Sequence, residues 1–564
     1  MHENFATILE TVAEQRPDRT AITRGAVNLT WQQLEERAAR LAGFLASRGV
    51  GTDDRVAIAL YNGPGYIETV FAALKLRAIP VNINYRYQAA EMAHVLADAN
   101  AAAIVFDATL ASRVATAAGA VPSLRTLVRA ESPAAADTPA TGDAATAGGA
   151  AGPGAADPPT WGYEDVIAAH APLPRAARGV DHWLMYTGGT TGKPKGVLVD
   201  HAWLYPVISA NGFRLIGEPV PDSLAGLRAV TRRLTAAHGD ALVCLPAPPL
   251  MHATGMYTTL GALVASGRVV FLTGRSYDPA ELARTVAPAR VDTVSIVGDV
   301  FALPLADALD AAAAAGRPYD VSGLRRILSV GVTWSAQVKR RLLAHGDFVC
   351  RDLVAASEGG PFAISETRRG DDAITARFTL APGARVIDEA GRDVRPGSGQ
   401  VGLLAAPADD TIGYVGDPAK TEQTFRTFGG TRWVVTGDLA SLEADGSITF
   451  RGRGSRVINT GGEKVFAEEV EQVLMEHPGV RDALVVGVPD ERWGHRIAAV
   501  VAPSVPGAVT EPELAGYVGA RLAAYKKPRT VVFVPAIQRS PAGKADLRWA
   551  RDIAAADPRP RQAP

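Results

Sequence analysis

Apolar and polar residues along the first half of the chain form segments typical of helices and strands in turn. After Thr30, apolar residues recur at helical spacing from Leu34 to Leu45. Thr30 and Gln33 have the spacing of a capping box, and Gly49 is a typical stop signal. The pattern therefore predicts an amphipathic helix that begins after Thr30 and ends before Gly49.

Short apolar runs bounded by turn residues predict buried strands between such helices. Because strands and helices alternate, we expect an α/β fold with mixed sheets in the first part of the chain. The predicted strands occupy residues 54–60, 102–106, 241–245 and 269–272.

The pattern changes after Gly391, where short strands separated by glycines are followed by a helix near Ala467 and a strand over 482–488. This change predicts a second, smaller and mobile α+β domain that begins near Gly454. The predicted domains are therefore a large N-terminal one over 1–453 and a small C-terminal one over 454–564.

Two stretches depart from this alternation. Residues 131–160 contain almost no large apolar side chain, which predicts a low-complexity surface loop, with a docking linker as the alternative. Residues 241–267 are uncharged and long enough to span a bilayer. Prolines 246, 248 and 249 interrupt that stretch, so it is predicted to be a strand, a loop and a helix instead.

Composition narrows the possible functions. The 564 residues are 47% hydrophobic and 21% charged with a net charge of -1, which is typical of a soluble globular protein and gives no basic surface for nucleic acid. Cys244 and Cys350 lack a metal-ligand or redox spacing. The N-terminus has no apolar signal segment. These features predict a cytoplasmic protein without a transmembrane segment.

The stretch YTGGTTGKPKGV, residues 186–197, is suited to binding a polyphosphate. Glycines let backbone N–H groups approach an anion, and threonines and lysines add donors and charge. The stretch is not a P-loop, because Thr187 and Pro194 stand where that motif requires Gly and Ser or Thr. A different phosphate-binding loop is therefore expected.

Five further stretches follow in a fixed order, at residues 357–360, 413–425, 434–439, 451–471 and 540–548. With the loop at 186–197 they resemble the motif series of the adenylate-forming superfamily, which includes acyl-CoA synthetases, luciferases and peptide-synthetase adenylation domains. Residues 74–87, 330–335, 458–471 and 483–494 most resemble bacterial acyl-CoA synthetases acting on fatty acids or steroid side chains.

The resemblance implies that ATP activates a carboxylic acid to acyl-AMP with release of pyrophosphate, and that CoA then accepts the acyl group. Such a site must supply positive charge where negative charge accumulates. It also implies one Mg²⁺ bound by Glu358, since a hard cation accepts a carboxylate together with phosphate oxygens. The implied ATP- and AMP-binding residues are Thr187, Gly188, Gly189, Thr190, Thr191, Gly192, Lys195, Gly331, Val332, Ser357, Asp438 and Arg453.

The resemblance also assigns roles in the two half-reactions. Lys544 is the implied catalytic cation of adenylation, and the other implied catalytic residues are Thr190, Lys195 and Glu358. Rotation of the small domain about a hinge at Ser455 would then bring Gly461, Gly462 and Glu463 to the thiol of CoA. His252 is implied to line the acyl pocket, with a packed core histidine as the alternative.

Three positions depart from the family pattern. Val354 and Ala355 stand where an aromatic residue and a glycine usually stack on adenine, which removes about 1 kcal/mol of stacking. Ser455 replaces the usual hinge Asp or Lys. Gly188 replaces a Ser, which removes one hydroxyl donor from the phosphate loop.

Several alternatives stay open at this point. The acyl group could pass to the phosphopantetheine of a carrier protein instead of CoA, because the adenylation residues are the same. The chain could also be a non-catalytic member that binds nucleotide or acyl-adenylate, although the presence of Lys544, Asp438, Arg453 and Glu358 argues against this. The identity of the acid and the oligomeric state, including a homodimer, are not indicated by the sequence.

Overall fold

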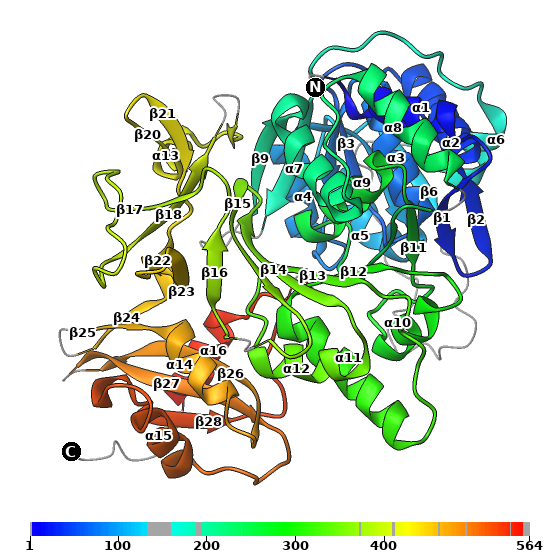
Figure 1. Cartoon of the computed structure of the whole chain (residues 1–564). Helices are drawn as coiled ribbons and strands as arrows, with labels where there is room; N and C mark the ends of the chain where they lie inside the picture. The colour runs from blue at the N-terminus through cyan, green and yellow to red at the C-terminus, as the bar shows by residue number, and fades with distance from the viewer. Residues whose placement is uncertain are drawn as a thin grey trace. The chain divides into compact units, whose positions relative to one another are not determined.

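The fold was analysed in a computed structural model of the chain. The structure describes residues 3–131, 159–187, 194–237, 240–371, 374–408, 412–460, 463–490, 493–541 and 543–556. These residues form two compact units: residues 1–295 with 409–421, and residues 296–408 with 422–564. Each unit is an assembly of sheets flanked by helices (Figure 1).

The first unit contains two sheets. One has the order β2-β1-β11-β10-β12, with β1 parallel to β11 and β10 parallel to both β11 and β12. Its strands are β1 (Thr20–Arg24), β2 (Val27–Thr30), β10 (Val243–Pro246), β11 (Arg268–Phe271) and β12 (Thr293–Ile296).

The other sheet of the first unit has the order β19-β9-β8-β4-β3-β5-β6-β7. Strands from β8 to β7 run parallel, as expected when helices connect them, whereas β8 and β9 form an antiparallel hairpin. Its strands are β3 (Arg55–Ala59), β4 (Ile79–Asn82), β5 (Ala101–Asp107), β6 (Thr126–Ala130), β7 (Thr160–Gly162), β8 (His182–Thr187), β9 (Lys195–Asp200) and β19 (Gly413–Tyr414).

Ten α-helices flank these sheets in the described part of the first unit. They are α1 (Phe5–Gln15), α2 (Trp31–Ser47), α3 (Pro64–Lys75), α4 (Ala89–Asp98), α5 (Ala111–Ala118), α6 (Tyr163–Ala169), α7 (His201–Phe213), α8 (Leu224–Ala236), α9 (Ala253–Val264) and α10 (Pro279–Val286). In α2, Thr30 accepts a bond from the Gln33 N–H and Gln33 accepts one from the Thr30 N–H, so the predicted capping box is present.

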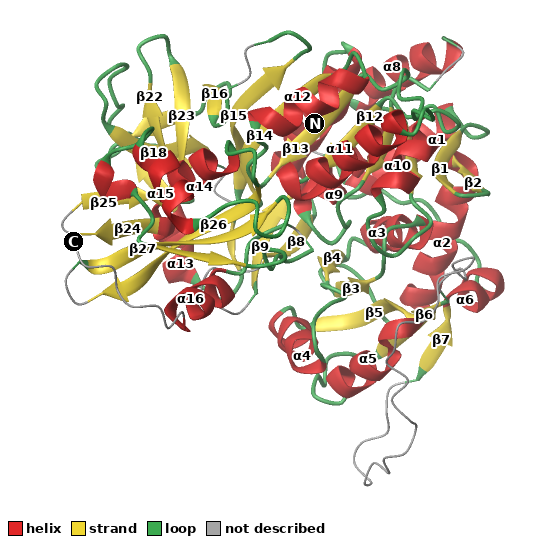
Figure 2. Ribbon diagram, turned by 90° about the horizontal axis from the view of Figure 1, so that it is seen from below, coloured by secondary structure: helices red, strands yellow, loops and turns green. Residues whose placement is uncertain are grey.

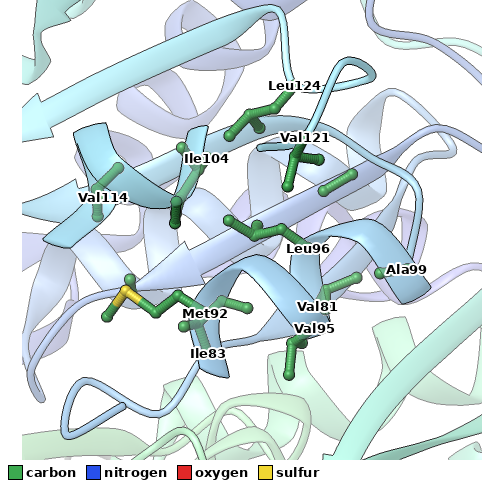
Figure 3. Close-up of a cluster of buried hydrophobic side chains, with 14 of the residues drawn as sticks. Val81, Ile83, Met92, Val95, Leu96, Ala99, Ile104, Val114, Val121 and Leu124 are labelled. Atoms are coloured by element: carbon green, nitrogen blue, oxygen red, sulfur yellow. The ribbon is translucent and has the colours of Figure 1, made fainter. Parts of the chain in front are cut away.

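Helices α4 and α5 cover one face of the parallel strands with a buried apolar cluster (Figure 3). Met92, Val95 and Leu96 of α4 meet Ile104 of β5 and Val81 of β4, and all five are fully buried. Their spacing on α4 follows the helical period, which presents one apolar stripe to the sheet.

The second unit contains a long mixed sheet in the order β13-β14-β15-β16-β23-β22-β18-β21-β20, with β17 paired to β18. Only β13 and β14 are parallel neighbours within this path. The strands are β13 (Arg326–Val330), β14 (Val349–Ala356), β15 (Gly359–Thr367), β16 (Arg377–Leu380), β17 (Arg385–Ile387), β18 (Val401–Pro407), β20 (Phe425–Phe428), β21 (Thr431–Val434), β22 (Asp438–Leu442) and β23 (Ser447–Arg453); the helices are α11 (Gly298–Ala314), α12 (Ala336–His345) and α13 (Pro418–Thr424), the last of which begins in the first unit.

After residue 454 the second unit forms a five-stranded sheet with its own helices (Figure 2). Side chains on β26 alternate between two apolar clusters: Ala483 and Val485 pack with α14 and α15, whereas Leu484 and Val486 pack with α16. Each face is therefore covered. The elements are β24 (Val457–Thr460), β25 (Glu463–Phe466), β26 (Val480–Asp490), β27 (Gly494–Pro503), β28 (Thr530–Phe533), α14 (Ala467–Met475), α15 (Glu511–Gly519) and α16 (Leu547–Ala556).

The α/β fold class predicted from the sequence is confirmed, and the four predicted strands correspond to β3, β5, β10 and β11. The stretch 241–267 forms strand β10, a loop and helix α9, as expected. No helix among the described residues is both long and apolar enough to cross a bilayer. Of the predicted surface loop, residues 132–158 lie outside the described part, and Thr160 begins β7.

We expect Leu96→Ala to destabilise the first unit by about 2–5 kcal/mol, because the side chain is fully buried between α4 and the sheet. The matched control is Val27→Ala, whose side chain is 52% exposed and which should change stability by about 0.5 kcal/mol or less. Thermal unfolding of the unliganded protein measures both. Equal unfolding temperatures for the two variants would contradict the cluster's role.

Candidate active site

The phosphate-binding stretch predicted at 186–197 connects the two strands of a hairpin in the first unit. Thr187 is the last residue of β8, Lys195 is the first of β9, and the two residues are paired across the strands. The predicted loop residues Gly188, Gly189, Thr190, Thr191 and Gly192 lie outside the described residues. What the structure establishes is that the loop begins and ends on two adjacent, hydrogen-bonded strands.

Lys195 forms an ion pair with Asp417, which comes from a motif 222 residues later in the chain. Strand β19 brings this motif to Lys195 by pairing Gly413 and Tyr414 with β9. The hydrogen bond from Lys195 and then the backbone N–H of Lys420 lower the pKa of Asp417. The structure therefore brings together two of the motifs that the sequence analysis quoted separately.

His252 lies in the loop between β10 and α9, also in the first unit. It is the residue immediately before α9, and its carbonyl accepts the Met256 N–H at 3.0 Å. Its side chain is half-buried. A position at the start of a buried helix is compatible with both interpretations of this histidine, the acyl-pocket residue and the packed core residue.

In the second unit, predicted nucleotide-binding residues follow two parallel neighbouring strands. Gly331 and Val332 come directly after β13, and Ser357 and Glu358 form the turn between β14 and β15. Because β13 and β14 are parallel, their carboxyl ends lie at the same edge of the sheet, where α/β proteins commonly bind ligands. Gly331 has a positive φ of 106°, a conformation that favours glycine.

Asp438 and Arg453 face each other across β22 and β23 and form an ion pair at 3.2 Å. The Asp438 side chain is buried and also accepts a hydrogen bond from the Thr436 hydroxyl, whereas Arg453 is partly exposed. The sequence predicted both residues near a ribose, and the structure adds that they are partners of each other. The pairing holds a carboxylate and a guanidinium at the end of the two strands.

Lys544 lies on a short loop before α16 and is exposed to solvent. It interacts electrostatically with Arg453, Glu358 and Asp438. Its pKa is lowered, first by the loss of hydration near the surrounding protein and second by the charge of Arg453, while Glu358 and Asp438 act in the opposite direction. The second unit thus brings together four residues separated by up to 186 positions in the printed sequence.

Among the residues predicted for the hinge and the thiol face, the structure describes Ser455 and Glu463. Ser455 belongs to the 3-10 turn Gly454–Arg456, directly after β23. Glu463 is the exposed first residue of β25. Gly461 and Gly462 lie outside the described residues. Arg456, the last residue of the turn, is ion-paired with Glu468 and Glu471 of α14. These ion pairs connect the C-terminal end of the turn to α14.

The two departures near the expected adenine position are visible on β14. The register of the pairing between β14 and β15 shifts between Val354 and Ala356, so Ala355 lies where the pairing is irregular. A Cβ built on Gly360 would approach the Ala355 side chain at 3.4 Å. These small residues therefore lie at the point where β14 leaves regular pairing, immediately before Ser357 and Glu358.

Sequence reasoning missed Asp299, a buried carboxyl in the first turn of α11. Its Oδ1 accepts the Ser335 N–H at 3.0 Å, while Oδ2 has no hydrogen-bond partner among the described residues. Burial, opposed by the hydrogen bonds of Ser335 and reinforced by the nearby charge of Asp482, raises its pKa to about 7. A single acid within the apolar run SIVGDVFALPL was the available signal.

Comparison with family models assigns the chain to a class. A model described as AMP-binding enzyme matches residues 9–405, and one described as AMP-binding enzyme C-terminal domain matches residues 469–544. The chain belongs to the AMP-binding enzyme family, the adenylate-forming superfamily expected from its motifs. It is an acid–thiol ligase of the AMP-forming type, a class shared by its relatives over nearly the full length.

Two curated relatives cover almost the whole chain. The medium/long-chain-fatty-acid–CoA/3-oxocholest-4-en-26-oate–CoA ligase of Mycolicibacterium smegmatis is 35% identical over 98% of this chain and 96% of its own length. The 3-oxocholest-4-en-26-oate–CoA ligase of Rhodococcus rhodochrous is 36% identical over 97% of this chain and 95% of its own. The expected likeness to fatty-acid and steroid-acid ligases is therefore confirmed.

Solved structures share the fold at lower identity. An anthranilate CoA ligase, AuaEII, crystallised with anthranoyl-AMP, has a TM-score of 0.79 at 20% identity and covers 98% of this chain and 97% of its own. A fatty acyl CoA synthetase of Mycobacterium tuberculosis has a TM-score of 0.65 at 22% identity, covering 98% of each chain. At these identities the likeness shows the fold alone.

Asp299→Asn is expected to stabilise the protein increasingly as the pH rises. A carboxyl whose pKa is raised in the folded state contributes stability below its unfolded pKa of 3.8, and this contribution is lost as the pH rises through about 7. Asparagine does not ionise, so the variant does not lose this stability as the pH rises. The gain above pH 7 should reach up to about 4 kcal/mol, since one pKa unit is worth about 1.4 kcal/mol.

The measurement is the difference in unfolding temperature between variant and unmodified protein from pH 4 to pH 8. Asp320→Asn is the matched control of opposite sign, because the hydroxyl of Ser322 lowers the pKa of that exposed carboxyl. A difference for Asp299→Asn that stays constant with pH would contradict the raised pKa.

Proposed function

We propose that this protein activates a medium- or long-chain aliphatic or steroid side-chain carboxylic acid with ATP and transfers the acyl group to CoA. The observation that carries the proposal is the convergence of Lys544 with Glu358, Asp438 and Arg453 in the second unit. Two cations and two carboxylates in one place suit a nucleotide with ionised phosphates and ribose hydroxyls.

In the first half-reaction, a carboxylate oxygen of the acid attacks the α-phosphorus of ATP, and the bond to pyrophosphate breaks. Both reactants are anionic, so a fixed cation at the reacting centre lowers the barrier. Lys544 would supply that cation. Thr187, Lys195 and the loop between them would bind the β- and γ-phosphates, with Ser357, Gly331 and Val332 at the nucleotide, and Asp438 would accept hydrogen bonds from the ribose hydroxyls.

Glu358 is the residue that would hold Mg²⁺. Among the described residues, no group of three or more His, Cys, Asp and Glu side chains could hold a metal ion. A single half-buried carboxylate near the candidate nucleotide residues nevertheless fits magnesium, which commonly binds one or two carboxylates together with substrate phosphates. When bound, the ion would neutralise part of the triphosphate charge.

In the second half-reaction, the CoA thiol attacks the acyl-AMP carbonyl, AMP leaves and the thiol proton is released. Under the proposed domain division at residue 453, rotation about Ser455 would withdraw Lys544 and present Gly461, Gly462 and Glu463 to the thiol. Hinge rotation of this kind changes the backbone angles of only a few residues. The ion pairs that hold Arg456 to α14 support the placement of the hinge just before that residue.

The preference for aliphatic and steroid acids rests on the relatives. Two relatives at 35% and 36% identity over nearly the full length are named for fatty-acid or cholestenoate substrates. A feruloyl-CoA synthase of Amycolatopsis sp. is also related, at 30% identity over 94% of this chain. The higher identity favours the aliphatic class, with His252 proposed to line the acyl pocket.

The substrate is tested by mass spectrometry of products formed from ATP, Mg²⁺, CoA and a panel of medium-chain, long-chain, steroid side-chain and aromatic acids. We expect acyl-CoA from one or more aliphatic or steroid acids. Acyl-CoA from aromatic acids alone would contradict the proposed substrate class. Acyl-AMP that accumulates without acyl-CoA would contradict CoA as the acceptor and indicate a carrier-protein phosphopantetheine instead.

Lys544→Ala is expected to lower the adenylation rate on the order of 10²–10³-fold, as loss of one preorganised donor does in other enzymes. Pyrophosphate release measures this step. The same variant should still convert synthetic acyl-AMP and CoA to acyl-CoA, because Lys544 acts only in the first half-reaction. Lys527→Ala, which removes an exposed lysine of the same domain, is the matched control. Unchanged pyrophosphate release from Lys544→Ala would refute its role.

A further inference from the structure

We propose that Arg539 and Asp482 are positioning residues for adenylation, because together they fix the loop that carries Lys544. The proposal rests on the proposed role of Lys544. The hydrogen bonds of Arg539 go to Asp482 and Gly543, outside the four charged groups of the candidate site, and neither Arg539 nor Asp482 was singled out by the sequence. Their contribution lies in where they hold the peptide that precedes Lys544.

The loop is closed on itself by hydrogen bonds to Ser540. The Ser540 N–H donates to the Lys544 carbonyl at 2.8 Å, and the Lys544 N–H donates to the Ser540 hydroxyl at 3.2 Å. The Gly543 N–H donates to the Ser540 carbonyl at 2.8 Å, and a β-bridge joins Arg539 to Ala545. Both backbone polar groups of Lys544 are thus satisfied within the loop, so the loop needs an external anchor to fix its place.

Arg539 provides that anchor. Its guanidinium donates two hydrogen bonds to the Asp482 carboxylate, at 2.8 and 3.1 Å, and a third to the Gly543 carbonyl at 3.1 Å. Asp482 lies on β26, the strand at the end of the small-sheet order that pairs with β27, next to the buried Ala483. The side chains of Arg539 and Asp482 are 17% and 26% exposed, and a bidentate pair of this kind is among the stronger hydrogen-bonded ion pairs.

The Gly543 carbonyl belongs to the peptide bond that leads into Lys544. One arginine therefore links strand β26 to the backbone carbonyl next to the proposed catalytic residue. Gly543 also packs against α11: a Cβ there would lie 3.2 Å from Val297 and 3.3 Å from Val300, and its φ is +72°. The loop is consequently held on one side by Arg539 and on the other by the start of α11.

Precise anchoring is needed because the electrostatics of Lys544 are unfavourable. Loss of hydration and then the nearby charge of Arg453 lower the pKa of Lys544, against the opposite effect of Glu358 and Asp438, and Arg453 repels its ammonium group. A lysine side chain has a long flexible stem, so the ammonium can turn toward solvent unless its backbone is held in register. A displacement of about 1 Å at a reacting centre can lower a rate about 100-fold.

Arginine is suited to this place for a geometric reason. Its planar fork offers several donors in fixed directions, so it can bind both Asp482 oxygens and the Gly543 carbonyl at once. A lysine at position 539 could neutralise Asp482 but could not keep all three hydrogen bonds in that geometry. The conservative Arg539→Lys change therefore separates positioning from simple charge balance.

The test measures the two half-reactions separately in the full-length protein. Adenylation is followed by pyrophosphate release, and thiolation by acyl-CoA formation from synthetic acyl-AMP and CoA. We expect Arg539→Met to lower the adenylation kcat about 10–100-fold with little change in the KM for ATP, and to leave thiolation unchanged. Arg539→Lys should give an intermediate rate, and Asp482→Asn should resemble Arg539→Met.

The decisive comparison is the double variant Arg539→Met with Lys544→Ala. If Arg539 acts through Lys544, the double variant adenylates no more slowly than Lys544→Ala alone, because effects through a shared group are not additive. Arg551→Met, which removes an exposed arginine of α16, is the matched control and should keep full activity.

Three results would overturn the proposal. They are an unchanged adenylation rate in Arg539→Met, an equal loss in adenylation and thiolation, and a further loss when Arg539→Met is added to Lys544→Ala. Failure of the proposed function can be distinguished from failure of this proposal. It would appear as a wild-type adenylation rate in Lys544→Ala, or as no acyl-AMP from the unmodified protein with any acid. Thiolation and unfolding temperature report whether each variant is folded.

Discussion

The ion pair between Asp438 and Arg453 is the constraint on which the candidate site of the second unit depends. It fixes the guanidinium of Arg453 at the end of β23, where the charged groups of the site converge. Because that guanidinium repels the ammonium of Lys544, the carboxylates of Asp438 and Glu358 are needed to keep both cations in one place. The two cations are thus balanced by two carboxylates, and a polyanionic substrate that binds there would meet two fixed positive charges.

The chain that leaves β23 also connects this site to the small sheet. Arg453 is ion-paired with Asp438 of β22, whereas Arg456, three residues later, is ion-paired with Glu468 and Glu471 of α14. Two arginines close in sequence therefore form ion pairs with different parts of the second unit. A change in backbone angles between them would move α14 and the small sheet while Arg453 stayed on β22. Glu468 also packs so closely on Gly452 that a Cβ there would lie 2.1 Å from its carboxyl carbon.

Local features were predictable from the sequence, and long-range pairings were not. The capping box of Thr30 and Gln33 depends on residues three apart, and the strand segments depend on short apolar runs, so both were found. The pairing of Lys195 with Asp417 depends on β19 joining a sheet more than 200 residues earlier, which no local pattern encodes. The Arg539–Asp482 pair and the buried carboxyl of Asp299 were missed for the same reason, because burial and partners are set by tertiary packing. The family resemblance predicted a set of nucleotide-binding residues, but it could not indicate which of them are one another's partners.

The two-sided covering of the small sheet has a consequence for the energetics of any rearrangement. Apolar side chains on both faces of β26 and β27 are buried by helices of the same part of the chain, with α14 and α15 on one face and α16 on the other. Turning this part as a rigid body would expose none of that apolar core to water. The free energy needed for this rotation would be limited to the polar and van der Waals contacts at the margin of the rotating part. Examples are the contact of Gly543 with Val297 and the ion pair of Arg481 with Asp307. A binding free energy of ordinary size for a nucleotide or an acyl-adenylate is then sufficient to choose between orientations.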